Sequence, residues 1–214
     1  MCPKHAIALL LLAAAAMPET TLGAEDGPFV PGSRLALLIG VNDWSGLGDL
    51  QAAGGGNFHS TGAILAAVGH RRVAEFEHST LLVGGEAGFF RTDSNIPGLT
   101  THLSAQGMYF IPSLKLALGR QRNIYLDAGT GVYIVGFNET GCDDFGCGEL
   151  QELWEDSQFA GYLGIGADLR FNKSWALAFE AKVHFADFDT ITGLGVGPQS
   201  LDGPIYLFQV GVVF

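Results

Sequence analysis

The chain has 214 residues, of which 22 are acidic and 11 are basic, so its formal net charge is −11. Such a chain repels the phosphates of nucleic acids, and we therefore expect no nucleic-acid partner. Only 15% of the residues are charged, 31 are glycine and the mean hydropathy is slightly positive. This composition is unusual for an acidic soluble protein, but it is typical of strands that alternate between lipid and a crowded interior.

The first 24 residues have the layout of a secretory signal peptide. A weakly basic start is followed by an apolar stretch, Ala6–Met17, and then by a polar segment that ends in small residues. The apolar stretch is too short to cross a bilayer as a helix, so we expect cleavage after Gly23 or Ala24. Residues 25–32 are expected to form a tether, and residues 33–214 a single domain.

Apolar side chains at every second position recur along the rest of the chain, as in strands that have one apolar face. The first strand is predicted over Arg34–Asn42, and a Gly-rich loop over Ser45–Asn57 follows it. The second strand is predicted at about Thr61–Arg72. The outward faces are assigned as Leu35, Leu37, Ile39 and Val41 in the first strand, and as Ile64, Ala66 and Val68 in the second.

The third and fourth predicted strands combine an apolar outer face with a polar inner face. The third covers Ser79–Arg91 with Glu86 inward, and a polar loop over Thr92–Leu99 follows it. The fourth has Met108, Phe110, Leu114, Leu116 and Leu118 outward, and Tyr109, Ser113 and Lys115 inward. Pro112 has no backbone donor for the ladder, so we expect a local irregularity there.

Three further strands are predicted over Asn123–Phe137, Gln158–Phe171 and about Trp175–Phe185. Two long loops, Asn138–Ser157 and Asp187–Gly203, are expected among them. The polar residues assigned to the inner faces of these strands are Tyr125, Asp127, Tyr133, Tyr162, Asp168, Arg170, Glu180, Lys182 and His184.

The last eleven residues, Pro204–Phe214, form the eighth predicted strand. Its alternate apolar residues are Tyr206, Phe208, Val210, Val212 and Phe214, while Gln209 and Gly211 lie on the other face. This segment is long enough for a tilted strand to cross a bilayer. It resembles the C-terminal strand of bacterial outer-membrane β-barrels, and the resemblance implies that it closes the barrel and is recognised by the barrel assembly machinery.

The chain as a whole resembles the OmpA-like family of outer-membrane β-barrel domains. The expected fold class is all-β, an eight-stranded antiparallel up-and-down transmembrane β-barrel, with short turns and both termini on the periplasmic side. The alternative is a soluble lipocalin-like barrel, in which the apolar face would point inside. We favour the membrane barrel because the polar face mixes Gly and Ala with charges, as suits a crowded interior.

An eight-stranded barrel has an interior that side chains can fill. The predicted lumen charges are five cations, Arg34, Arg71, Lys115, Arg170 and Lys182, and four anions, Glu86, Asp127, Asp168 and Glu180. Near neutrality is what a salt-bridged plug requires, because unpaired buried charge is costly. A narrow conduit lined by charge is the alternative.

The loop Asn138–Ser157 carries seven carboxylates and no Lys or Arg. It also contains Cys142 and Cys147, which in an exported protein are expected to form a disulfide, since a zinc site would need two more ligands. Several carboxylates could bind a divalent cation such as Ca²⁺, although no Ca²⁺-loop motif is present and a solvated anionic surface is favoured.

His184 and His78 are the two catalytic candidates among the histidines. Small outer-membrane lipid A deacylases carry a His-x-Ser motif, whereas the corresponding stretch here, His184–Ala186, has no hydroxyl group. His78 and Ser79 lie at a short periplasmic turn, where adjacent side chains point to opposite faces, so they do not form a close nucleophile–base pair. No catalytic residue, cofactor site or metal site is therefore assigned.

The expected function is that of a non-enzymatic outer-membrane barrel with a structural or surface-interaction role and acidic extracellular loops. The alternatives are a narrow conduit for small or hydrophobic molecules, similar to OmpW, and a lipid A-modifying enzyme. Expected partners are outer-membrane lipid, lipopolysaccharide and the assembly machinery, and the chain is expected to be a monomer.

Overall fold

The computed structural model describes residues 33–48, 60–95, 101–119, 123–143, 146–171, 175–186, 188 and 203–214. The predicted signal peptide and tether lie outside these residues. Within them, no helix has the length and apolar character that a membrane-crossing helix needs.

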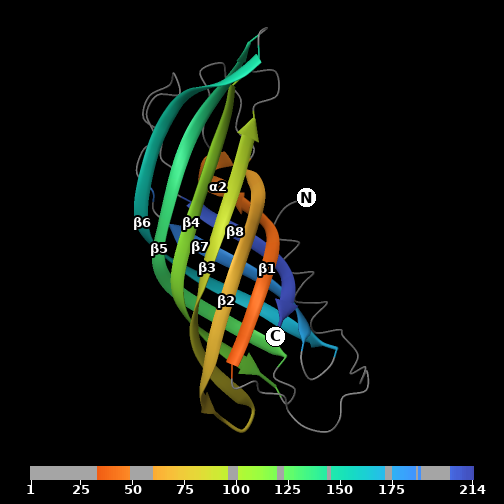
Figure 1. Cartoon of the computed structure of the whole chain (residues 1–214). Helices are drawn as coiled ribbons and strands as arrows, with labels where there is room; N and C mark the ends of the chain where they lie inside the picture. The colour runs from red at the N-terminus through yellow and green to blue at the C-terminus, as the bar shows by residue number, and fades with distance from the viewer. Residues whose placement is uncertain are drawn as a thin grey trace.

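Eight antiparallel strands close into one barrel in sequence order, because β1 pairs with both β2 and β8 (Figure 1). A short helical turn, α2 (Ser45–Gly48), follows β1. The strands are β1 (Ser33–Trp44), β2 (Thr61–Glu75), β3 (Ser79–Asn95), β4 (Thr101–Leu118), β5 (Ile124–Asp143), β6 (Gly146–Arg170), β7 (Ala176–Ala186) and β8 (Gly203–Val213). The predicted eight-stranded barrel is therefore confirmed.

The outer wall of this barrel is apolar. Phe159 is 71% exposed and Phe110 is 64% exposed. Each strand contributes at least one such side chain, for example Leu37, Leu65, Phe89, Leu114, Ile134, Leu163, Phe185 and Val210. An apolar surface of this extent is unfavourable in water but suits the hydrocarbon layer of a bilayer. The arrangement is the reverse of a soluble barrel, so it favours the membrane-spanning architecture.

The face assigned to the second strand was wrong. Ala66 is only 2% exposed and points inward together with Ile64 and Val68, while Leu65 is 56% exposed on the outer wall. The register explains the difference, because Ala66 pairs directly with the buried Leu38 of β1 and direct partners share a face. Both faces of β2 carry apolar residues, so alternation alone could not select one of them.

The segment Asn138–Ser157 is also not the loop that we expected. β5 and β6 continue through it as a long hairpin that projects beyond the other strands (Figure 1). The backbones of Cys142 and Cys147 pair directly, and Asp143 pairs with Gly146. The acidic composition of the segment concealed the strands, since outside a membrane both faces of a hairpin can be polar.

The irregularity expected at Pro112 is confirmed. Between β4 and β5, Phe110 pairs with Val132 and Ser113 pairs with Gly129, and the ladder is interrupted at Ile111 and Pro112. On its other side, β4 stays paired with β3 through these two residues. The missing backbone donor of proline is therefore accommodated at one interrupted ladder rather than by a change of register.

The connections differ in length at the two ends of the barrel. β2 joins β3, β4 joins β5 and β6 joins β7 through residues 76–78, 119–123 and 171–175, and we call this the short-turn end. The first residues of β1 and Phe214 lie there too, because the backbones of Leu35 and Phe214 are hydrogen-bonded to each other. We call the opposite end the long-loop end.

Candidate functional site

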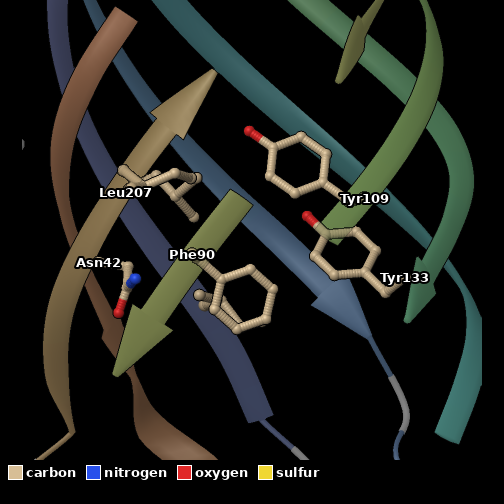
Figure 2. Close-up of a pocket in the computed structure, with 7 residues that line it drawn as sticks. Asn42, Phe90, Tyr109, Tyr133 and Leu207 are labelled. Carbon is tan, nitrogen blue, oxygen red and sulfur yellow. The ribbon is translucent and has the colours of Figure 1, made fainter. Parts of the chain in front are cut away.

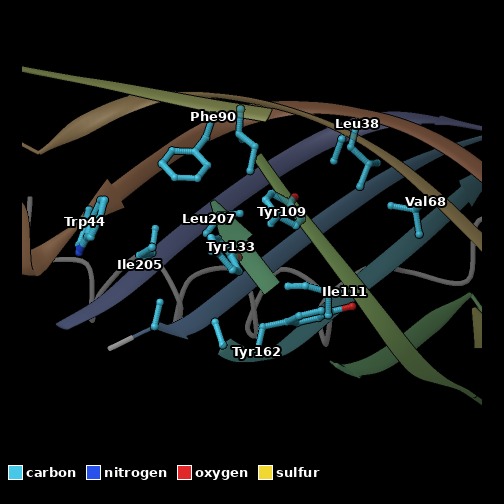
Figure 3. Close-up of a cluster of buried hydrophobic side chains, with 14 of the residues drawn as sticks. Leu38, Trp44, Val68, Phe90, Tyr109, Ile111, Tyr133, Tyr162, Ile205 and Leu207 are labelled. Atoms are coloured by element: carbon cyan, nitrogen blue, oxygen red, sulfur yellow. The ribbon is translucent and has the colours of Figure 1, made fainter. Parts of the chain in front are cut away.

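The barrel interior is the candidate site, and it has two parts along the barrel axis. The part toward the short-turn end holds the buried charged side chains Arg34, Glu86, Lys115, Asp127, Glu180 and Lys182. The part toward the long-loop end is apolar and aromatic, and it includes Trp44, Phe90, Ile205 and Leu207 (Figure 3). Phe137 and Phe188 pack against Trp44.

Glu180 of β7 is the centre of the charged part. One carboxylate oxygen, Oε1, accepts hydrogen bonds from the Tyr125 hydroxyl at 2.7 Å, from Lys115 Nζ at 3.1 Å and from Arg34 Nη2 at 3.3 Å. The second oxygen, Oε2, lies 2.6 Å from Lys182 Nζ. Four groups from four different strands are thus held by one buried carboxylate.

Arg34 extends the network to the short-turn end. Its guanidinium donates to both oxygens of Asp168, from Nε at 2.9 Å and from Nη2 at 2.8 Å. This two-point geometry is the strong form of an Arg–carboxylate pair. The Asp168 side chain is 19% exposed, so the pair lies where the buried network meets the mouth of the barrel.

Lys182 and Lys115 connect the Glu180 carboxylate to two further carboxylates. Lys182 Nζ donates to Glu86, which also accepts a hydrogen bond of 2.5 Å from the Tyr109 hydroxyl. Lys115 Nζ lies 3.4 Å from Asp127. Each lysine therefore bridges two anions, which is how several charges can be buried together at tolerable cost.

Arg71 is not part of the interior, so its assignment to the lumen was wrong. It lies on the outer face opposite Val83 of β3, and its neighbour His70 points inward instead. The error follows from the wrong face assignment in β2, where the predicted inward and outward residues are exchanged. Without Arg71 the predicted set has four cations, Arg34, Lys115, Arg170 and Lys182, against four anions, Glu86, Asp127, Asp168 and Glu180, so it is neutral. Of these eight, Asp168 and Arg170 are partly exposed.

His70 and Ser113 form a buried pair that the sequence did not reveal. His70 Nε2 lies 2.8 Å from Ser113 Oγ, although the two residues come from β2 and β4. The glycine between them, Gly84 of β3, pairs with both, so that the imidazole can cross the intervening strand. Both side chains are only 4% exposed, and this argues for packing rather than nucleophilic catalysis.

The two candidate histidines, His184 and His78, differ in their exposure to solvent. His184 is buried, is hydrogen-bonded to the Tyr133 hydroxyl through Nδ1 and stacks on Tyr162 at 4.9 Å between ring centroids. His78 is 71% exposed in the β2–β3 turn, 3.6 Å from Glu77. Among the described contacts, His184 has no serine partner and no hydrogen bond joins His78 to Ser79.

Tyrosine rings fill the interior by lying across glycines of the neighbouring strand. A Cβ added to Gly166 would overlap the ring of Tyr125, and one added to Gly88 would overlap the ring of Tyr109. The lack of a side chain at Gly166 lets the Tyr125 hydroxyl reach Glu180. The inward glycines are therefore part of the network's geometry.

The apolar part contains a small cavity of about 10 Å³, room for about one water molecule. Asn42 and Phe90 lie on one side of it and Tyr109 and Tyr133 on the other (Figure 2). The Asn42 amide donates to the Ala63 carbonyl at 3.2 Å and accepts from the Thr92 hydroxyl at 2.7 Å. Packed polar and aromatic side chains thus surround this small cavity in the described part of the barrel.

The predicted disulfide and cation site concern side chains outside the described ones. The side chains of Cys142 and Cys147 and the carboxylates of Asn138–Ser157 lie outside the described side chains, so the disulfide and the cation site stay predictions. Among the residues whose positions are described, no group of three or more His, Cys, Asp or Glu could hold a metal ion.

The terminal strand has the faces that its alternation predicts. Phe214 is 59% exposed and Val210 is 46% exposed on the outer wall. Tyr206, Phe208 and Val212 are half-buried on the same face, while Gln209 is buried inside. Recognition of this strand by the assembly machinery stays a prediction.

No known family model matches the sequence, and no curated protein sequence matches it. Among solved structures, the outer membrane protein OprG from Pseudomonas aeruginosa is 14% identical with a TM-score of 0.41, and the match covers 85% of this chain and 95% of OprG. The outer membrane protein AlkL, solved in lipid bilayers, is 16% identical with a TM-score of 0.43 over 92% of this chain and 96% of AlkL. Neisserial surface protein A is 9% identical with a TM-score of 0.40 over 85% of this chain and 94% of its own. Similarity of this extent carries no information about ligands or activity.

Proposed function

We propose that this chain is an integral barrel of the bacterial outer membrane with a plugged interior, both termini in the periplasm and a non-enzymatic structural or surface-interaction role. The observation that carries the proposal is the combination of an apolar outer wall with a buried, nearly neutral charge network. The outer wall requires lipid, and the network occupies the space that a solute would need.

The long β5–β6 hairpin supports the surface-interaction role. It projects beyond the membrane-spanning strands at the long-loop end, and its sequence from Asn138 to Ser157 has seven carboxylates. A solvated anionic projection can bind cationic partners directly and anionic lipopolysaccharide through divalent cations. In this proposal the hairpin is the part of the molecule that meets other molecules outside the cell.

A conduit for small hydrophobic molecules is the second candidate, and the apolar part of the interior favours it. Trp44, Phe90 and Leu207 belong to a packed apolar cluster between the charged network and the long-loop end (Figure 3). A hydrophobic molecule that displaced these side chains would still meet the charged part of the interior. We therefore prefer the structural or surface-interaction role, with a plugged interior, over the conduit.

Deletion of Phe214 is the first test, because the terminal strand pairs with β1 and closes the barrel. We expect the shortened chain to give at most about a tenth of the wild-type folded barrel in the outer membrane, measured by heat-modifiable mobility on a gel. Val210→Ala, which also trims the outer face of β8 but keeps the terminus, is the control and should fold nearly as wild type does. Wild-type assembly without Phe214 would contradict the proposal.

A further inference from the structure

The β5–β6 hairpin projects beyond the end of β7 and leaves one edge of β6 open (Figure 1). β6 pairs with β5 from Gly146 onward, but it pairs with β7 only from Ala160 onward, because β7 ends at Ala186, the partner of Ala160. Within the described residues, no strand pairs with the β7 side of residues 146–156. We call this stretch the β6 edge.

The register shows which backbone groups face the β6 edge. Asp168 donates its backbone N–H to the Asn123 carbonyl at 2.7 Å, so its backbone groups point toward β5. Alternate residues of an antiparallel strand direct their N–H and C=O groups to the same side. The register with β5 is regular from Ala167 up to Trp154, so Glu155 directs its N–H and C=O away from β5. An unpaired edge with such groups can accept an added strand.

Charge determines which strand can bind at the β6 edge. Residues 146–156 contain four acids, Glu149, Glu152, Glu155 and Asp156, and no Lys or Arg. Residues 187–202 of the same chain contain three Asp and no Lys or Arg, and a second copy would bring the same four acids. Like charges on neighbouring strands are destabilising, whereas opposite charges stabilise the pair. A cationic strand from another protein is therefore the best match.

Two irregularities in the hairpin make the β6 edge more selective. The register between β5 and β6 shifts at Phe137/Asn138 and again at Glu139/Thr140. Bulges and charged side chains are two means by which proteins keep sheet edges from pairing with each other. The β6 edge has both, but it contains no proline, so each of its residues keeps a backbone donor. Pairing between identical chains is thus disfavoured, while a strand of opposite charge can still bind.

We infer that the β6 edge binds an extended cationic segment of another protein by strand addition. The inference rests on the proposed surface role of the hairpin, and it adds the mode of binding and the class of partner. Backbone hydrogen bonds to residues such as Glu155 supply affinity, and the carboxylates of the hairpin select for Lys and Arg.

Two peptides of equal charge test the inference on the full chain, folded in detergent. The first is a labelled peptide of about ten residues in which Lys and Thr alternate. The second has the same sequence with every backbone amide N-methylated, so it keeps the charges but has no N–H donors. Fluorescence anisotropy should show about tenfold tighter binding of the first peptide. Its binding should also slow amide hydrogen exchange in residues 146–156, but not in β2.

Two substitutions at one position separate the backbone from the charge. Glu155→Gln and Glu155→Pro remove the same carboxylate, but only proline also removes the N–H that faces the β6 edge. We expect glutamine to weaken binding of the first peptide about twofold, and proline about tenfold. Heat-modifiable mobility verifies that both variants fold.

Equal affinity for the two peptides, or equal weakening by the two substitutions, would overturn strand addition and leave the anionic surface role intact. A folded barrel that binds neither peptide would contradict the surface role as well. Slow exchange of residues 146–156 without any peptide would also overturn the inference, because the β6 edge would already be covered. Residues 187–202 would then be the cover if the protection did not depend on protein concentration, and a second copy if it did.

Discussion

Replacing Glu180 with glutamine is expected to lower the free energy of unfolding of the barrel by about 3–5 kcal/mol. Glutamine keeps the shape of the side chain but removes the charge that Lys115, Lys182 and Arg34 share. Three buried cations would then be short of one anion, and the desolvation that they suffered on folding would no longer be offset. Urea unfolding of the protein in lipid vesicles, followed by tryptophan fluorescence, measures the change.

Asp168→Asn is the matched control for Glu180. Asp168 also pairs with Arg34, but its side chain is partly exposed at the mouth of the barrel and contacts one cation at 2.8 Å. Arg34 keeps its contact with Glu180 after this change, so the expected loss is about 1 kcal/mol. Equal losses for the two variants, or a Glu180→Gln barrel as stable as wild type, would show that the network does not stabilise the interior as we infer.

Gly166→Ala should destabilise the barrel by about 2–3 kcal/mol, although it adds a single methyl group. That methyl would overlap the buried ring of Tyr125, which must then move. Because the Tyr125 hydroxyl donates to Glu180 at 2.7 Å, displacement of the ring also weakens the network around Glu180. The same unfolding experiment applies.

Gly69→Ala is the comparison, because Gly69 also lies within a strand and has no positive φ. Gly69 lies on the outer face of β2, and a Cβ there would meet no atom within 4 Å. We expect no loss and a gain of up to about 0.5 kcal/mol, because alanine restricts the unfolded chain. If both substitutions cost the same, the cost would come from strand glycines in general rather than from the ring of Tyr125.

Alternation along the chain was sufficient to predict most of the wall. In β1 and β7, outward apolar residues alternate with inward residues that are small or polar, with Leu38 and Trp44 as the exceptions. A shift by one residue would expose charge to lipid, so only one face assignment was possible. In β2 this contrast is missing, since Leu65 outside and Ile64 inside are equally apolar. Only the register with β1 decides the face, and a single sequence does not contain that register.

The contacts inside the barrel were harder to predict than the residues that make them. Most of the inward charges could be assigned from alternation, but Arg34 of β1 meets Asp168 of β6 across the interior, a contact that depends on the stagger of all strands. The His70–Ser113 pair depends in addition on the face of β2 and on the bare backbone of Gly84. Such contacts follow from closure of the barrel and have no local signal in the sequence.

The central claim is that buried side chains close the interior of a membrane-spanning barrel. Ion conductance of the purified, folded protein in planar lipid bilayers tests it most directly. We predict that the wild-type barrel inserts without steady conductance, because the Glu180 network and the apolar side chains above it fill the interior. Regular, long-lived conductance steps from wild-type protein would contradict the plugged interior and favour the conduit.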